Sequence, residues 1–504
     1  METYNYILLG LQVGFVPINL FFCFVGVFVG TLVGVLPGVG PAATMALLLP
    51  VTFHIAPVSA IIMLAGIYYG AMYGGSTTSI LVNIPGEAAS VITCLDGYKM
   101  ARKGRAGPAL GMAAFASFIA GTAGVVILML IANPMAVFVL KFGPPEYFAV
   151  MVLGMTLLIY LVQGSRIKAL VMACFGLILG FIGIDVLTGQ NRLNFGWMEL
   201  ADGVGLVPLI MGIFGISEVL TNMEEATKQE LYETKISGLF PSLKDWSDSK
   251  WPIVRGTLLG FFLGVVPGGG PAIASFASYA MEKKISKHPD RFGTGIIEGV
   301  AGPEAANNSA TAGGFIPLFL IGIPTNGILA MLFSAMLIHG LQPGPLLLKQ
   351  NPEIFWGTVM SMYLGNIMLL ILNLPMIGIW VKILKIPYGI LFPIILFFCL
   401  IGAYSINNNV MDVIVMLVFG VIGYLMRKFE YEGAPLILAF ILGPMMEQSF
   451  IQALNMSGGN YTVFFASRIS AVAMILSLGF ILSALVMGFR RKDPTKEPLL
   501  RVKS

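Results

Sequence analysis

Long apolar runs recur along the whole chain, and short breaks rich in glycine, proline and small polar residues separate them. A transmembrane helix needs about 20 predominantly apolar residues to cross a hydrocarbon core about 30 Å thick. Runs of this kind predict roughly ten or more membrane spans. Clear examples are Ala109 to Ala132, Tyr147 to Val162, Ala169 to Ile184, Phe355 to Val381 and Ile469 to Phe489.

The composition fits a protein whose main solvent is lipid. Of the 504 residues, 57% are hydrophobic and only 11% are charged, whereas a soluble globular chain carries about 25% charged residues. The formal net charge of +4 is small for this length, and the basic residues occupy short loops beside apolar runs. The sequence therefore predicts an all-α polytopic membrane protein in a lipid bilayer and argues against nucleic acid as a partner.

One internal repeat is visible, in which Gly26 to Ala42 corresponds to Gly256 to Ala272 at an offset of 230, with nine of 17 positions identical. Later landmarks return in the same order: Ile84-Pro85 is followed by Ile323-Pro324, and Gly107-Pro108 by Gly344-Pro345. The chain therefore divides into two homologous halves. The predicted organisation is a first transmembrane repeat over 1–220, a cytoplasmic linker over 221–250, a second repeat over 251–465, and an extra C-terminal transmembrane helix with a basic cytoplasmic tail over 466–504.

Basic residues indicate that the two repeats cross the membrane in opposite senses. The first half carries four of them between Lys99 and Arg105, just before Gly107-Pro108, whereas the corresponding stretch of the second half, Ile338 to Pro345, has none. The second half instead has its basic cluster at Lys283 to Arg291. Since basic loops prefer the cytoplasm, we expect an inverted repeat with a periplasmic N-terminus and a cytoplasmic C-terminus.

Each half contains a Gly/Pro motif that should break a helix. Trp251 to Val266 and Ala272 to Met281 are each too short to span a bilayer alone, so they predict a re-entrant hairpin with Pro267 to Pro271 at its tip. Pro37 to Pro41 is the equivalent tip of the first half. Irregular backbone at membrane depth survives only when buried in protein or lining a cavity. We therefore assign substrate binding to the tip glycines Gly38, Gly40, Gly268 and Gly270.

A second break follows in each half, where small hydroxyl and amide side chains precede an Ile-Pro pair. Such side chains can supply oxygens for a sodium-sized cation and donors for a carboxylate. Helix capping and interhelical hydrogen bonding are the alternative explanation. The residues assigned to substrate binding are Ser76, Thr77, Asn83, Pro85, Asn308, Ser309, Thr325 and Asn326. Those assigned to a coupling cation are Thr78, Glu87, Glu304, Asn307 and Thr311.

Ionisable groups near the breaks are of special interest because charge is expensive inside a membrane. The acidic candidates are Glu87, Glu298 and Glu304. Neither lysine nor arginine occurs in the candidate segments, so an anionic substrate would be held by helix N-termini, backbone amides and a co-bound Na⁺ or H⁺. The sequence predicts neither a cofactor nor a transition-metal site.

At these motifs the chain resembles the large membrane subunit of the tripartite tricarboxylate transporters. The resemblance lies in Gly34 to Pro41, in Tyr68 to Glu87 and in Val266 to Pro271, and it extends from about residue 15 to 490. It implies a bacterial inner-membrane carrier that works with a small membrane subunit and a periplasmic substrate-binding protein. It also implies import of citrate or a related tri- or dicarboxylate, driven by a sodium or proton gradient.

Two other function classes compete with a secondary transporter. An intramembrane enzyme would need a nucleophile and base or a metal cluster, and the chain contains no His-Glu-x-x-His and no Gly-x-Ser-x-Gly. A passive channel would need neither a partner receptor nor an ion gradient. The sequence therefore predicts a transporter and not an enzyme, with a passive channel or an intramembrane enzyme as the alternative.

Reporter fusions at Lys287 and at Gln342 test the inverted repeat. We expect the first to report the cytoplasm and the second the periplasm, because the two halves place the same landmarks on opposite sides. The measurement is alkaline phosphatase and green fluorescent protein activity of each fusion. Finding both sites on the same side would exclude the inverted arrangement.

Overall fold

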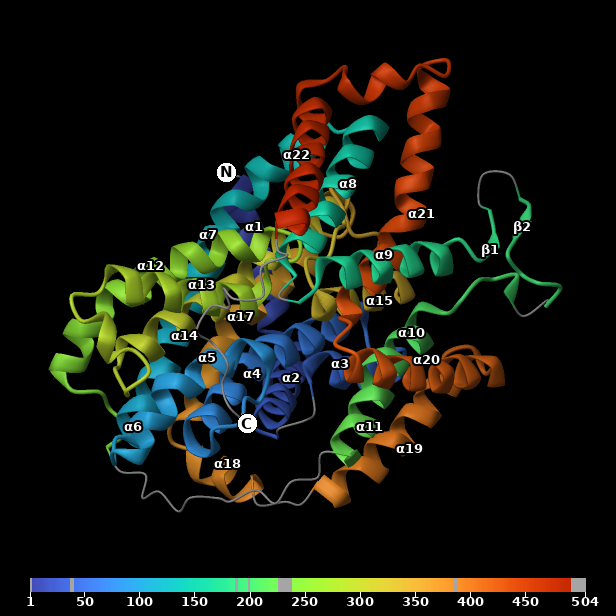
Figure 1. Cartoon of the computed structure of the whole chain (residues 1–504). Coiled ribbons are helices and arrows are strands. Elements are labelled where there is room, and N and C mark those ends of the chain that lie inside the picture. Colours follow the sequence, from blue (N-terminus) through green and yellow to red (C-terminus); the bar gives the residue numbers. More distant parts are fainter. Residues whose placement is uncertain are drawn as a thin grey trace.

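The computed structural model describes residues 2–36, 40–162, 164–185, 189–197, 200–224, 238–384 and 388–490. Helices make up most of this part of the chain, and they pack side by side around a buried centre (Figure 1). Seven of the described helices are long and apolar enough to cross a membrane. The chain is thus an all-α polytopic membrane protein, as predicted.

The first half runs from α1 to α11 and includes one small strand pair. Its long helices are α1 (Glu2–Gly14), α2 (Pro17–Val35), α3 (Pro41–Thr52), α4 (Pro57–Val82), α7 (Ala106–Val139), α8 (Pro144–Leu161) and α9 (Arg166–Gly180). Its short elements are η1 (Ala88–Ser90), α5 (Val91–Thr93), η2 (Cys94–Tyr98), α6 (Lys99–Arg102), β1 (Gly183–Ile184), β2 (Asn191–Arg192), α10 (Leu206–Ile210), η4 (Met211–Ile216) and α11 (Ser217–Glu224).

The second half runs from α12 to α22. Its long helices are α12 (Leu243–Val265), α13 (Gly270–Ile285), α14 (Glu298–Ile316), α15 (Gly327–Ile338), α17 (Pro352–Asn373), α19 (Tyr388–Asn407), α20 (Val410–Lys428), α21 (Gly433–Met456) and α22 (Arg468–Arg490). Its short elements are η5 (Pro289–Arg291), η6 (Pro317–Ile321), α16 (Leu347–Gln350), α18 (Ile377–Ile383) and η7 (Tyr461–Phe465).

Close glycine packing joins α2 to α4 and, in the same way, α12 to α14. A β-carbon added to any glycine of the two repeated triplets would lie only 2.1–2.5 Å from a carbonyl oxygen of the partner helix. The triplets are Gly26, Gly30, Gly34 and Gly256, Gly260, Gly264, and the carbonyls belong to Met63, Ile67, Ala71 and to Gly302, Ala306, Ala310. Small residues allow helix backbones to approach this closely, which compensates for the absence of a hydrophobic driving force within lipid.

Both Gly/Pro motifs interrupt a helix, as predicted. In the first half α2 ends at Val35 and α3 begins at Pro41. In the second half α12 ends at Val265 and α13 begins at Gly270 and packs back on α12. Proline at the first positions of each returning helix suits the helix N-terminus, where its missing N–H costs nothing.

The second break of each half has the same backbone geometry, at an offset of 239 residues. Asn83 and Gly322 both lie in the left-handed region, with φ of 58° and 83°. Glu87 and Asn326 then cap the next helical turn with nearly identical angles, φ −153° in both and ψ of 169° and 172°. The two halves therefore share their fold locally, while their relative sense across the bilayer stays a prediction.

The two predicted basic loops lie together at one end of the molecule. The buried Asp96 carboxylate accepts hydrogen bonds from the amides of Gly293, Gly295 and Ile296 at 2.7–3.0 Å. The Lys103 amine also donates to the Thr294 carbonyl at 2.6 Å. This contact fixes the loop before α7 to the loop before α14, which agrees with a common cytoplasmic side for both clusters.

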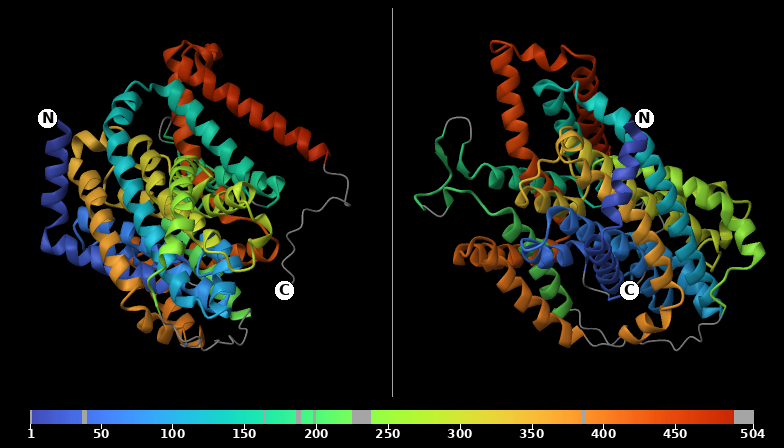
Figure 2. Two further views of the ribbon diagram at one scale, coloured as in Figure 1. Left: turned by 90° about the vertical axis from the view of Figure 1, so that its left-hand side faces the viewer. Right: turned by 180° about the vertical axis from the view of Figure 1, so that it is seen from behind.

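Outer helices surround the glycine-packed centre. α7 packs on α14, and α17 packs on α4. At the opposite edge α22 lies along α8, and α21 contacts α8 and α9 (Figure 2). The antiparallel β1–β2 pair projects away from the helices in both figures.

Two apolar runs differ from their predicted form. The run Phe355 to Val381 is divided, because α17 ends at Asn373 and α18 begins only at Ile377. Pro375 lies between the two helices and disfavours helix at the residue before it.

The first arm of the second-half hairpin is α12, and it begins eight residues before Trp251, the predicted start. Ser242 and Asp245 form a capping box at its N-terminus. α12 therefore has 23 residues, but its added turns are polar, and it is not among the seven described helices that are long and apolar enough to cross a membrane, so the re-entrant arm stays a prediction.

Replacing Gly260 with Ala should destabilise the fold, because the new methyl group would collide with the Ala306 carbonyl 2.1 Å away. We expect a loss on the order of 1–3 kcal/mol, seen as a lower melting temperature of the detergent-solubilised protein. The matched control is Gly479→Ala on α22, where nothing lies within 4 Å of the added carbon. Equal melting temperatures for the two variants would contradict the close packing of α12 on α14.

Candidate functional site

The tip of the second hairpin depends on glycine. Gly268 and Gly270 adopt φ values of 79° and 57°, a region that residues with a β-carbon resist. The Gly268 amide donates to the carbonyl of Thr325 at 2.8 Å. The hairpin tip and the second break of the same half are thus held together, although 57 positions separate Gly268 from Thr325 in the chain.

Asn326 caps the helix that starts at this second break. Its Oδ1 accepts hydrogen bonds from the amides of Ile328 and Leu329, both at 3.0 Å. Its Nδ2 donates to the hydroxyl of Tyr68, a fully buried residue of α4, at 2.9 Å. The Asn326 side chain is therefore held from both sides, which fixes the N-terminus of α15 against the first half.

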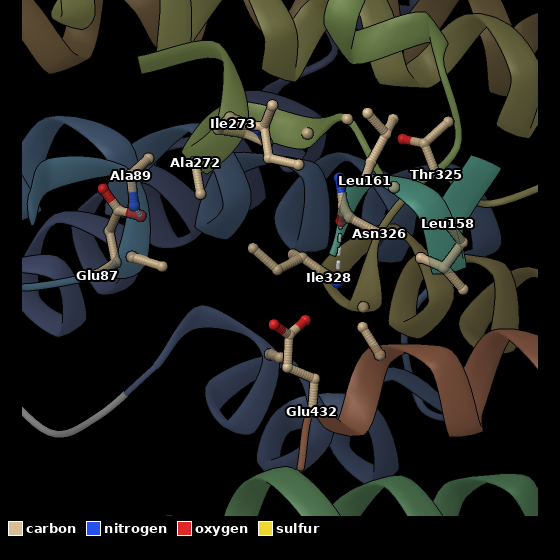
Figure 3. Close-up of a pocket in the computed structure, with 18 of the residues that line it drawn as sticks. Glu87, Ala89, Leu158, Leu161, Ala272, Ile273, Thr325, Asn326, Ile328 and Glu432 are labelled. Atoms are coloured by element: carbon tan, nitrogen blue, oxygen red, sulfur yellow. Dashed lines mark hydrogen bonds between the residues drawn. The ribbon is translucent and has the colours of Figure 1, made fainter. Parts of the chain in front are cut away.

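A cavity of about 360 Å³ opens between the tip, the two second breaks and the outer helices (Figure 3). This volume lies within the range of small-molecule sites, about 300–1,000 Å³. Its polar or backbone-exposing lining residues are Glu87, Gly268, Gly269, Gly270, Thr325, Asn326, Gly327 and Glu432. Apolar side chains, among them Leu158, Leu161, Phe214 and Ile273, line the remainder.

The electrostatics of the cavity combine helix N-termini with carboxylates. α13 and α15 both begin at its wall, and no side chain caps α13. Unpaired amides at a helix N-terminus favour an anion. Glu87 and Glu432 also line the cavity, and the Glu432 carboxylate points into it (Figure 3), whereas the described residues of its lining include neither lysine nor arginine.

Two buried oxygens in residues that line the cavity have no hydrogen-bond partner within the described part of the chain. They are Thr325 Oγ1, in a residue with 0% exposure, and Glu87 Oε1. Buried polar atoms are normally hydrogen-bonded, so an unpaired one requires an explanation. The other Glu87 oxygen accepts from the Ala89 amide at 2.6 Å.

A second polar group surrounds Glu304, which is completely buried in α14. Ser76 donates to its Oε2 at 2.6 Å, Asn307 donates to the same oxygen at 3.3 Å, and Thr93 donates to Oε1. Ser117 lies at the edge of the group, 3.5 Å from Oε2. Among the described residues no lysine or arginine forms an ion pair with Glu304. Carboxylate, hydroxyl and amide oxygens are ligands of hard cations.

Polar side chains connect the Glu304 group to the cavity. Asn326 binds Tyr68, and the Tyr68 hydroxyl faces Thr311. Thr311 donates to the carbonyl of Asn307, whose amide reaches Glu304. These contacts link the Glu304 group to the wall of the cavity.

A comparison with protein families decides which family this chain belongs to. The family model described as the tripartite tricarboxylate transporter TctA family matches residues 20–438, which include both Gly/Pro motifs, both second breaks and the cavity. The chain belongs to the TctA family.

Two relatives come from Agrobacterium vitis. The chain is 49% identical over 492 residues, 98% of each chain, to the uncharacterized 52.8 kDa protein in the TAR-I ttuC' 3' region. It is 48% identical over 233 residues to the uncharacterized protein in the TAR-II ttuC' 3' region, covering 46% of this chain and 96% of that one. No solved structure matches the chain. TctA membership implies a component of a tricarboxylate transporter, with a small membrane subunit and a periplasmic binding protein.

The other residues predicted to bind substrate or cation lie away from the cavity. Gly38 is outside the described residues. Asn83 is exposed at the end of α4, and Pro85 is half-buried in the break after it. The Gly40 amide donates to Glu218. Thr77 is buried beside Ser117.

Three of these predicted residues make interhelical or capping contacts. Asn308 donates to Ser117 Oγ at 2.7 Å, and Ser309 donates to the Thr257 carbonyl at 2.7 Å. Thr78 donates to the Val35 carbonyl at 2.6 Å and so satisfies the last turn of α2. These hydrogen bonds correspond to the alternative explanation considered for the polar clusters. Glu298 begins α14 and is half-buried.

Several residues of the site were not assigned from the sequence. They are Tyr68, Thr93, Ser117 and Glu432, which tertiary packing brings to the site. Tyr68 could have been found as a polar aromatic residue inside a long apolar run, where its hydroxyl must find a partner. Glu432 could have been found as an acidic residue just before a predicted span.

Proposed function

We propose that this chain is the substrate-translocating subunit of a secondary active transporter that imports citrate or a related tri- or dicarboxylate. A gradient of Na⁺ or H⁺ drives the import by alternating access. A periplasmic binding protein delivers the substrate, and a small membrane subunit completes the assembly in the bacterial inner membrane. The N-terminus is periplasmic and the C-terminus cytoplasmic.

The cavity between the helix breaks is the observation that carries this proposal. It offers helix N-termini, the free hydroxyl of Thr325 and the amides around Gly270, all of which suit a carboxylate. Among the described residues its lining includes Glu87 and Glu432 and no basic side chain to balance them. A carboxylate brought next to these two groups in their ionised form is repelled unless a cation or protons enter with it. The charge pattern thus favours symport.

Glu304 is the best-placed carrier of the coupling cation. It is an ionisable group buried in a helix between the two halves, which is an expensive arrangement that usually has a function. The contacts through Asn307, Thr311 and Tyr68 connect it to Asn326 at the cavity. Binding of substrate and of cation can then favour the same conformation.

Uptake measurements in proteoliposomes separate the proposed function from its rivals. The chain is reconstituted with its partner proteins and supplied with a panel of labelled carboxylates under an imposed sodium or proton gradient. Accumulation against a concentration gradient supports a carrier, equilibration alone supports a channel, and chemical conversion of the label supports an enzyme. Dependence on sodium or on the proton gradient identifies the coupling ion.

Thr325→Val should lower kcat/KM for carboxylate uptake at least tenfold, because an apolar isostere removes the free hydroxyl from the cavity. Thr325→Ser should keep most of the activity. Thr358→Val is the matched control, since Thr358 is equally buried but donates to the carbonyl of Ile354 in α17. Initial uptake rates normalised to protein amount provide the measurement, and full activity of Thr325→Val would remove Thr325 from the site.

Glu304→Gln should abolish gradient-driven accumulation and preserve exchange of labelled for unlabelled substrate. The amide keeps the size of the side chain but cannot release a proton or neutralise a bound cation. Glu353→Gln at the start of α17 is the control. Accumulation and counterflow are measured in the same proteoliposomes. Wild-type accumulation by Glu304→Gln would show that coupling resides elsewhere.

A further inference from the structure

A second, much smaller cavity adjoins the Glu304 group. Its volume is about 10 Å³, roughly the room that one water molecule or one small ion needs. It lies between α4, α7 and α17, and its described lining shares no residue with that of the cavity at the second hairpin tip. The polar residues of its lining are Tyr73, Ser76, Thr77, Ser117 and Asn373. None of the lining residues in the described part of the chain is charged.

Asn373, at the end of α17, brings an unpaired oxygen to this small cavity. Its side chain is almost completely buried, and Oδ1 has no hydrogen-bond partner among the described residues. Its Nδ2 donates to the Leu369 carbonyl, one turn earlier in the helix, at 2.9 Å. This bond fixes the amide so that the oxygen is the end left free. Buried polar atoms are normally paired, so the free Oδ1 points to a ligand.

The hydroxyl groups around the small cavity use their protons elsewhere. Ser76 donates to Glu304 Oε2 at 2.6 Å, and Ser117 donates to the same oxygen over 3.5 Å. The Tyr73 hydroxyl donates to Asn366 Oδ1 at 2.7 Å. A hydroxyl has one proton and two lone pairs. These three groups therefore offer oxygen lone pairs, and not protons, to an occupant of the cavity.

This set of acceptors suits a cation better than a water molecule. A buried water typically makes about three hydrogen bonds, some as donor and some as acceptor, whereas Tyr73, Ser76, Ser117 and Asn373 all present acceptors. Oxygen ligands are what hard cations prefer. The Glu304 carboxylate lies one hydrogen bond behind Ser76, and a single ionised carboxylate balances a monovalent ion and not a divalent one.

We propose that the small cavity is a Na⁺ site, with the side-chain oxygens of Ser76, Thr77, Ser117 and Asn373 as ligands and Glu304 as the counter-charge. Three of these ligands belong to α4 and α7 of the first half, and Asn373 belongs to α17 of the second, so the ion joins the two halves. The inference rests on the proposed function for the role of the ion. It specifies Na⁺ as the coupling cation and places it beside Glu304.

Binding of radioactive Na⁺ to the purified full chain, without any substrate, tests the site. Thr77→Val removes one ligand oxygen with little change of shape, and Thr77→Ser keeps that oxygen. Thr358→Val is the matched control, since Thr358 is equally buried but donates to the carbonyl of Ile354. The ionic strength is held constant with choline chloride, and the label is displaced with unlabelled Na⁺.

We expect the half-displacing Na⁺ concentration to be at least fivefold higher for Thr77→Val than for wild type, because one ligand is lost. Thr77→Ser and Thr358→Val should stay close to wild type. Absence of displaceable label on wild type, or equal values for Thr77→Val and Thr358→Val, would overturn the proposal.

Asn373→Asp distinguishes a cation from a water molecule. The carboxylate keeps an oxygen at the cavity and adds a negative charge, which attracts a cation more strongly. Asn351→Asp adds the same charge at the other end of α17 and is the control. We expect Asn373→Asp to bind radioactive Na⁺ at least threefold more tightly than Asn351→Asp. Binding that is no tighter would mean that the cavity holds water only, and the proposal would fall.

The sodium site and the proposed function fail in different ways. If wild type accumulates a carboxylate under an ion gradient while Thr77→Val and its control bind Na⁺ alike, only the sodium site is wrong. If Na⁺ binds and responds to Thr77→Val and Asn373→Asp as expected, but no carboxylate of the panel accumulates, the site stands and the proposed transport function is wrong.

Discussion

A polypeptide that interrupts its helices within lipid must provide partners for the freed backbone groups, and the site of this protein follows from that constraint. In the second half the two interruptions satisfy one another, because the Gly268 amide binds the Thr325 carbonyl and Asn326 caps α15. The remaining amides, at the start of α13, face the cavity. The backbone amides that lack a helix hydrogen bond are therefore the groups that can bind a ligand in the cavity.

The two halves share a scaffold and differ in chemistry. Glycine triplets bring α2 onto α4 and α12 onto α14 at the same close distances, so the helix breaks are held by rigid neighbours. At equivalent positions of the second breaks, however, the first half has the acidic Glu87 and the second half the neutral Asn326. The Gly40 amide at the start of α3 binds Glu218, whereas no side chain caps α13. Such divergence allows one half to carry charge and the other to receive an anion.

Local rules were sufficient to predict the membrane class, both Gly/Pro breaks and five residues that line the cavity: Glu87, Gly268, Gly270, Thr325 and Asn326. Proline and glycine act on their own segment, and their effect can therefore be read from sequence. Tyr68, Thr93 and Glu432 could not be found in this way, because distant helices bring them to the site. The extension of α12 to Leu243 was missed because a capping box outweighed the polar character of its first turns.

The central claim is that the cavity beside the second hairpin tip binds the carboxylate substrate. It is tested most directly by cryo-electron microscopy of the full chain in lipid nanodiscs, with and without the carboxylate that shows the fastest uptake. The account predicts ligand density in contact with the amides at Gly270 and with the Thr325 hydroxyl. Density bound elsewhere, with this cavity unchanged between the two maps, would contradict it.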